Sequence, residues 1–100
     1  MAALQPFSPH YTSGQTVSAS NTAASVSIPA GNLNILVSNL STEVAYVRIS
    51  DVAVTATAAD MVIPANQSRM LTKRDVDVVL SHLSTVTGTT LHIIAGEGWL

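Results

Sequence analysis

The alternation of apolar and other residues between positions 33 and 50 is the feature that most restricts the fold of this chain. Residues 33–38 place an apolar side chain at every second position, and residues 44–49 do the same after a polar interval. A period of two is that of a β-strand with one buried side. The pattern therefore predicts a hairpin in which Val37 pairs with Ala45 and one fully apolar face is covered.

The opposite face of this predicted hairpin is unusually apolar for a surface in water. It carries Leu36, Val44, Tyr46 and Arg48. Two interpretations remain open: another part of the same chain covers these side chains, or they contact a partner or a second subunit. Arg48 is the member most typical of an interface, because its planar guanidinium pairs well with carboxylates.

Short strand patterns separated by turn residues continue through the rest of the chain. Further strands are predicted at residues 17–20, 25–28, 52–57 and 67–72, with Ile-Pro-Ala turns at residues 28–30 and 63–65. Short strands at this spacing predict an all-β fold, either a small β-sandwich or a jelly-roll-like barrel. A chain of 100 residues is expected to form one such domain, which we place at residues 15–100.

Residues 1–14 are predicted to form an extended N-terminal arm. Pro6 and Pro9 exclude a helix and disfavour a central strand. Phe7 and Tyr11 are two of the few aromatic residues of the chain, which has only 4% aromatic residues. We therefore expect the arm to dock, either on its own domain or on a neighbouring subunit.

Residues 75–84 fit two structures, because their apolar side chains have helical spacing while their valines favour a strand. We interpret them as a strand, since residues 79–93 have the pattern of a second hairpin turning at Gly88. In that register His82 lies opposite His92, and the two imidazoles share one face of the sheet.

The two histidines provide the one serious candidate for a metal site. His82 and His92 would supply two ligands, and His10 or a carboxylate a third. The alternative, which we adopt, is a pair of polar residues on a half-exposed face. The aspartates within residues 73–77 could likewise hold a cation, but the two adjoining basic residues favour a mixed-charge loop. We therefore predict no metal and no cofactor.

The composition argues against several classes of function. The net charge of −2 and the scattering of the few basic residues disfavour nucleic-acid binding. The absence of cysteine excludes disulfides and thiolate metal sites. The sequence has neither a nucleophile elbow nor a phosphate-binding loop, so we do not expect an enzyme. It also has no membrane-spanning run or signal-peptide pattern, so we expect the protein to stay in the cytoplasm where it is made.

The low charge of the chain points to association with other chains. Only 10% of its residues are charged, against about 25% in typical proteins. Because small uncharged surfaces favour association, we expect partner chains to cover much of this surface. The residues predicted at such an interface are aromatic, apolar or basic: Phe7, Tyr11, Leu36, Val44, Tyr46, Arg48 and Trp99.

A combination of short motifs between residues 34 and 100 is similar to a known group of proteins. The motifs are Ala-Tyr-Val-Arg at 45–48, Val-Thr-Ala-Thr-Ala-Ala-Asp at 54–60, Ile-Pro-Ala at 63–65, Leu-Thr at 71–72, Gly-Thr-Thr-Leu-His-Ile at 88–93 and Gly-Glu-Gly-Trp at 96–99. Together they resemble small virion proteins of tailed bacteriophages, of the kind that decorate or cement the capsid. The resemblance implies β-sandwich domains that assemble as small oligomers on the outside of the head, and it brings no catalytic residues.

The resemblance therefore implies a structural protein of the virion. We expect a homo-oligomer, dimer or trimer, that assembles in the host cytoplasm, binds the major capsid protein on the capsid surface and opposes the pressure of packaged DNA. Two alternatives remain. One is a head-completion or tail component of the same particle. The other is a glycan-binding β module, for which Trp99 is the best candidate aromatic residue.

Overall fold

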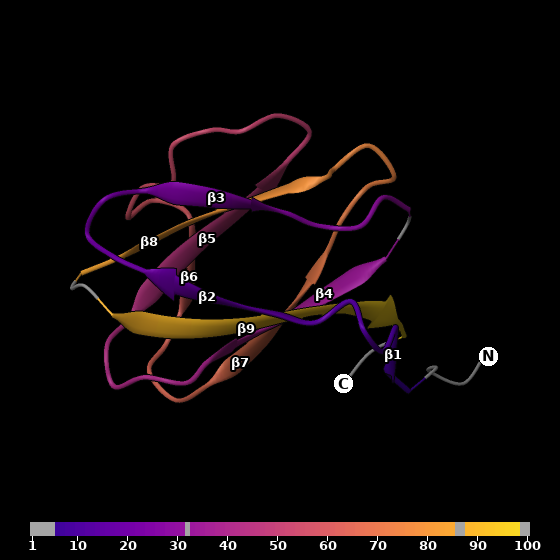
Figure 1. Ribbon diagram of the computed structural model, residues 1–100, viewed down its shortest axis with the longest axis horizontal. Helices are drawn as coiled ribbons and strands as arrows, with labels where there is room; N and C mark the ends of the chain where they lie inside the picture. Colours follow the sequence, from indigo (N-terminus) through magenta and orange to yellow (C-terminus); the bar gives the residue numbers. More distant parts are fainter. Residues whose placement is uncertain (1–5, 32, 86–87, 99–100) are drawn as a thin grey trace.

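The computed structural model describes residues 6–31, 33–85 and 88–98, and its strands form two antiparallel sheets (Figure 1). The strands are β1 (Ser8–Pro9), β2 (Gln15–Ala19), β3 (Ala24–Ser27), β4 (Asn34–Asn39), β5 (Ala45–Ser50), β6 (Met61–Ile63), β7 (Ser68–Thr72), β8 (Val79–Ser84) and β9 (Thr89–Glu97). The described residues include no helix, and hence none that could cross a membrane. The prediction of an all-β chain is confirmed.

The longest strand, β9, organises the five-stranded sheet. Strand β4 pairs with one side of β9, and β7 pairs with the outer side of β4. Strands β1 and β2 both pair with the other side of β9, at successive positions along its length. The four-stranded sheet has the order β3-β8-β5-β6. The chain passes between the two sheets repeatedly, for example between β2 and β3.

One apolar core lies between the two sheets and draws side chains from both of them. Ile35, Val37 and Ile93 come from the five-stranded sheet, while Val47 and Leu80 come from the four-stranded sheet. All five are at most 1% exposed. These residues occupy alternate positions in their strands, so the predicted apolar faces of residues 33–37 and 45–49 do face the core.

The predicted pairing of those two segments is wrong. Strand β4 pairs with β7 and β9, whereas β5 pairs with β6 and β8, so the two lie in different sheets. Val37 lies opposite Arg69 and Ile93, and Ala45 does not pair with it. The two apolar faces meet across the core instead of side by side. Alternation specifies which side of a strand is buried, but it does not specify the neighbouring strand.

The second predicted hairpin is also divided between the sheets. The interpretation of residues 79–84 as a strand is confirmed, but β8 pairs with β3 and β5, and β9 pairs with β1, β2 and β4. At the ends of these two strands Ser84 Oγ and Thr89 Oγ1 are in hydrogen-bonding contact at 2.7 Å. Gly88 has the predicted positive φ, at 89°, while residues 86 and 87 of the predicted loop lie outside the described part of the chain.

A strand predicted at residues 52–57 is absent from the structure, which describes all of these positions. Residues 51–60 instead connect β5 to β6. The Asp60 carboxylate accepts a hydrogen bond from the Thr57 amide at 2.8 Å, and the Asp60 amide donates to the Thr57 carbonyl at 3.1 Å. Such local bonds to short polar side chains compete with sheet pairing, which explains the turn at this place.

Candidate interaction surfaces

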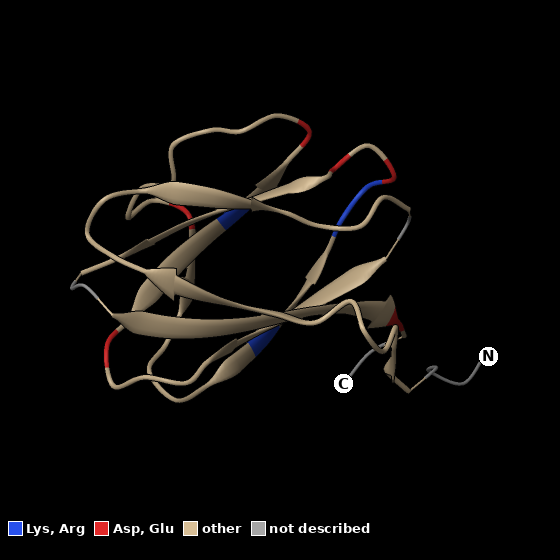
Figure 2. Ribbon diagram, viewed as in Figure 1, with Lys and Arg blue, Asp and Glu red and all other residues tan. Residues whose placement is uncertain are grey.

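The outer faces of the two sheets carry apolar side chains and few charges. Figure 2 shows that the acidic residues lie mainly in the connections, and that long stretches of both sheets carry no charge. Leu36 is on the outer face of the five-stranded sheet, because its neighbours Ile35 and Val37 point into the core. Tyr46 and Arg48 are by the same reasoning on the outer face of the four-stranded sheet. The single surface expected from the sequence is therefore divided between two sides of the molecule.

The Tyr46 face, as we call the outer face of the four-stranded sheet, has an apolar row across three strands. Tyr46 of β5 lies between Val62 of β6 and Leu83 of β8, directly opposite both. Val62 is 41% exposed, and Tyr46 and Leu83 are half-buried. Val44, which precedes β5, is also half-buried, and its carbonyl accepts a hydrogen bond from Ser84 Oγ at 3.0 Å.

Opposite charges lie toward the two ends of the Tyr46 face. Arg48 Nη1 is 4.0 Å from Asp60 Oδ1, and the Arg48 side chain remains 53% exposed. Toward the other end of β5, the exposed residue Glu43 has its Oε2 atom 3.5 Å from Thr85 Oγ1. Both charged groups are open to water, so both are accessible to a partner.

The Leu36 face, as we call the outer face of the five-stranded sheet, has a second apolar row. Leu36 of β4 lies between Met70 of β7 and Ile94 of β9, and all three side chains are half-buried. The next row along the strands is polar, and there Ser68 Oγ donates to Ser38 Oγ at 2.8 Å. These two rows contain no Asp, Glu, Lys or Arg.

Phe7 and Tyr11, which were predicted as contact residues, have different environments. The Phe7 ring packs over Gly96: a Cβ atom placed on Gly96 would lie 2.7 Å from the ring. Strand β1 pairs with the end of β9, and the His10 amide donates to the Ala95 carbonyl at 2.8 Å. Tyr11, by contrast, is 79% exposed. Trp99 lies outside the described residues.

The two histidines of the candidate metal site do not meet. His82 points into the core from β8, where it lies between Ala24 and Val47 and is 4% exposed. Its Nδ1 atom has no hydrogen-bond partner among the described residues, and burial lowers its pKa. His92 lies in the other sheet, with Nδ1 3.4 Å from Thr16 Oγ1. The prediction that they share a face is wrong, and the described residues bring no three metal-ligating side chains together.

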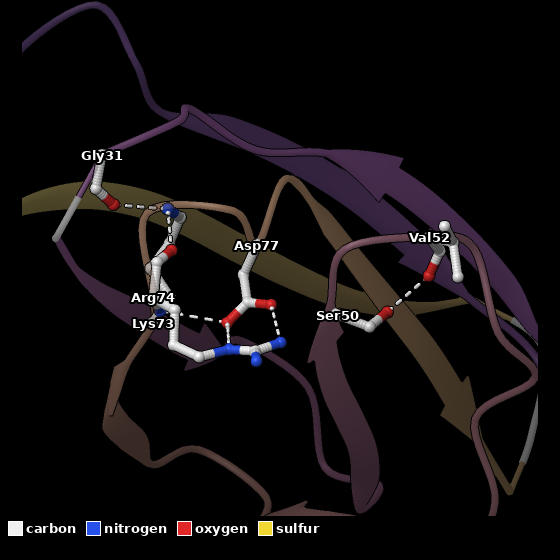
Figure 3. A network of polar contacts seen from close by, with 6 residues as sticks. All are labelled: Gly31, Ser50, Val52, Lys73, Arg74 and Asp77. Atoms are coloured by element: carbon white, nitrogen blue, oxygen red, sulfur yellow. Dashed lines mark hydrogen bonds and ion pairs between the residues drawn. The ribbon is translucent and has the colours of Figure 1, made fainter.

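The mixed-charge segment at residues 73–77 forms a compact polar network (Figure 3). Asp77 Oδ1 accepts from Arg74 Nη2 at 2.8 Å, and Oδ2 accepts from Arg74 Nε at 3.1 Å and from its amide at 3.0 Å. The side-chain bond from Arg74 is the main cause that lowers the pKa of Asp77. This carboxylate is thus already paired, as the interpretation of a mixed-charge loop requires.

Lys73 is buried, with only 3% of its surface exposed, which the sequence did not lead us to expect. Its Nζ atom donates to the Gly31 carbonyl at 2.6 Å and to the Arg74 carbonyl at 2.9 Å (Figure 3). The ammonium therefore ties the connection before β4 to the connection after β7. No feature of the sequence around Lys73 signals this, because Gly31 is 42 residues away.

Sequence reasoning also missed four members of the two apolar rows. These are Val62, Met70, Leu83 and Ile94. Each alternates with a core residue in its own strand, which is the signal that could have placed it on an outer face. Their grouping into rows required the strand order.

Comparison of the chain with protein-family models, with curated proteins and with solved structures finds no match. The two outer faces described above are therefore the features of the molecule that bear on its function.

Proposed function

We propose that this chain is a structural virion protein of a tailed bacteriophage, a capsid decoration protein that binds the major capsid protein and stabilises the head. One observation carries the proposal: a low-charge all-β chain presents an apolar row on the outer face of each of its two sheets. The resemblance of the motifs between residues 34 and 100 to phage decoration proteins supports it.

A decoration protein needs a rigid body and adhesive surfaces. In this proposal residues 15–100 form a β-sandwich or jelly-roll-like domain, and residues 1–14 are an extended arm. Two adhesive faces on different sides suit a protein that must contact the shell and also a neighbouring copy of itself. The chain would then act as a homo-oligomer, dimer or trimer, on the capsid surface after assembly in the host cytoplasm.

We assign the capsid contact to the Leu36 face. Its apolar row carries no charge, so little desolvation cost opposes its burial against the shell. The Phe7 ring lies beside the same sheet over Gly96, and it extends the apolar surface toward the end of β9. Aromatic side chains such as this one are enriched in protein interfaces.

The proposal is tested by adding the purified protein to phage heads that lack it. Wild-type protein is expected to co-sediment with the heads and to delay their release of DNA on heating. Leu36→Asp is expected to weaken binding at least about tenfold, because it buries an unpaired charge in the contact. Thr55→Asp is the matched control, since it adds the same charge at an exposed position of the connection between β5 and β6, away from the Leu36 face, and should bind normally.

Three results would contradict the proposal. The first is a wild-type protein that ignores such heads at high concentration. The second is immunogold label on the connector or tail with a bare shell, which would indicate a head-completion or tail component. The third is specific binding on a glycan array without binding to heads, which would indicate a ligand-binding β module.

A further inference from the structure

We propose that the Tyr46 face is the surface on which two copies of this chain associate, in a face-to-face dimer with its two-fold axis along the row Val62, Tyr46 and Leu83. The inference rests on the self-association included in the proposed function, and it adds the surface and the geometry. It is independent of which partner occupies the Leu36 face.

The apolar row is suited to meet a copy of itself. In a symmetric dimer, residues that lie on the two-fold axis contact their own counterparts. With the axis along the row, Val62, Tyr46 and Leu83 each pack against the same residue of the second copy. Apolar side chains tolerate such self-contact, and two tyrosine rings can stack offset with their hydroxyl groups at the rim.

The charges beside the row are arranged so that the same axis pairs opposite signs. Arg48 follows Tyr46 by two residues along β5, and Glu43 precedes it by three. A two-fold axis across the strands reverses their direction, so the segment that carries Arg48 in one copy faces the segment that carries Glu43 in the other. Both side chains are exposed, and Arg48 is only loosely paired with Asp60, at 4.0 Å. Each dimer would thus gain two Arg48–Glu43 pairs, which satisfies the guanidinium more fully than in the monomer.

The size of the face sets the expected strength of the dimer. The contact spans three strands that lie about 4.8 Å apart, and it extends about 17 Å along β5 from Glu43 to Arg48. Its area is therefore well below the roughly 800 Å² per partner of a standard interface. We therefore expect a weak dimer, with a dissociation constant no tighter than about micromolar, which becomes effective at the high local concentration of a decorated shell.

The first experiment uses the natural absence of cysteine in this chain. Val62→Cys is expected to be joined to its counterpart by a short bismaleimide crosslinker, because sheets packed face to face lie about 10 Å apart and a residue on the axis faces its own counterpart. Ser18→Cys, an exposed position of the other sheet, is the control and should remain uncrosslinked at the same concentration. Equal crosslinking of the two variants would overturn the proposal.

The second experiment reverses the charges and measures the dimer by sedimentation equilibrium. Glu43→Arg alone and Arg48→Glu alone are each expected to raise the dissociation constant at least about tenfold, since like charges then face each other. The double variant Glu43→Arg/Arg48→Glu restores opposite signs and should return to within about threefold of wild type. Circular dichroism checks that each variant is folded.

Several outcomes would overturn this proposal without affecting the assignment of the Leu36 face. One is a wild-type protein that stays monomeric up to millimolar concentration. Another is a double variant that is as weak as the worse single variant, because no pairing between Arg48 and Glu43 would then exist. A third is a Leu83→Asp variant that dimerises normally but no longer binds heads, which would make the Tyr46 face the capsid contact.

Discussion

His82 places a titratable imidazole in the apolar core. A neutral imidazole is tolerated in an apolar core, whereas a protonated one would need a partner, and His82 Nδ1 has none among the described residues. Burial therefore lowers the pKa of His82 below its usual value of 6.5. The sequence offered no sign of this, because the alternation that buries His82 also fits a half-exposed face on which it would be solvated.

The stability of the protein is consequently expected to depend on pH through His82. Below pH 6.5 the unfolded chain binds a proton at this residue and the folded protein does not, so the free energy of unfolding falls as the pH drops toward the lowered pKa. Urea denaturation between pH 7 and pH 5 measures the slope. His82→Leu, which fills a similar volume without a titratable group, is expected to flatten it, and His92→Gln should leave most of it. Equal slopes in wild type and His82→Leu would contradict the assignment.

Lys73 is a second residue whose role depends on long-range contacts. Replacing it by Met keeps the apolar stem but leaves the carbonyls of Gly31 and Arg74 without their ammonium donor. We expect a loss of about 1–3 kcal/mol in the free energy of unfolding, measured by chemical denaturation at neutral pH. Arg69→Met is the matched control, because within the described part of the chain the Arg69 side chain bonds only to the nearby Ser68 and Gln67, and it should change stability by less than about 0.5 kcal/mol. Similar losses in both variants would argue against a special role for Lys73.

The pairing of strand β1 with β9 depends on Gly96, a residue of β9 that has no side chain. A Cβ on Gly96 would lie 2.5 Å from the Ser8 carbonyl oxygen and 2.7 Å from the Phe7 ring. Gly96→Ala is therefore expected to displace β1 from β9 at a cost of about 1–3 kcal/mol. Hydrogen exchange of the His10 amide, which donates to Ala95, should become markedly faster. Ser18→Ala, at the far end of the same sheet, should leave that exchange rate unchanged, and a protected His10 amide in Gly96→Ala would refute the prediction.

The strands of this protein are largely predictable from its sequence, whereas their pairing is not. Strands β2, β3, β4, β5, β7, β8 and β9 overlap segments that the sequence pattern predicts as strands, although their ends differ by a few residues. The predicted strand at residues 52–57 fails, because Asp60 and Thr57 bond to the local backbone and hold a turn. The predicted pairings of strands are wrong for both hairpins, because a short interval between two strands is compatible with a hairpin and also with a crossing to the other sheet.

At the scale of the whole molecule, substitutions on the two outer faces are expected to affect different properties, namely head binding and dimer formation. Leu36→Asp should lose head binding and retain the dimer, while Leu83→Asp should lose the dimer and still bind heads as single copies. The physical reason is that the two residues lie in different sheets with the core between them. Binding isotherms on heads and sedimentation of the free protein measure the two effects. Loss of both properties in either variant, with the fold intact, would show that a single surface serves both contacts.

The sequence by itself determined the all-β character of this protein, most of its strands and the inward side of β4 and β5, because these follow from a period-two pattern that each strand carries locally. It also indicated an adhesive surface, through the shortage of charge and the apolar residues Leu36 and Tyr46. Only the tertiary structure decided that these two residues lie on different sheets, that His82 and His92 are apart, and that Lys73 is buried. Strand order and burial of this kind arise from contacts between segments that are distant in sequence, and the local alternation is the same whichever strands become neighbours.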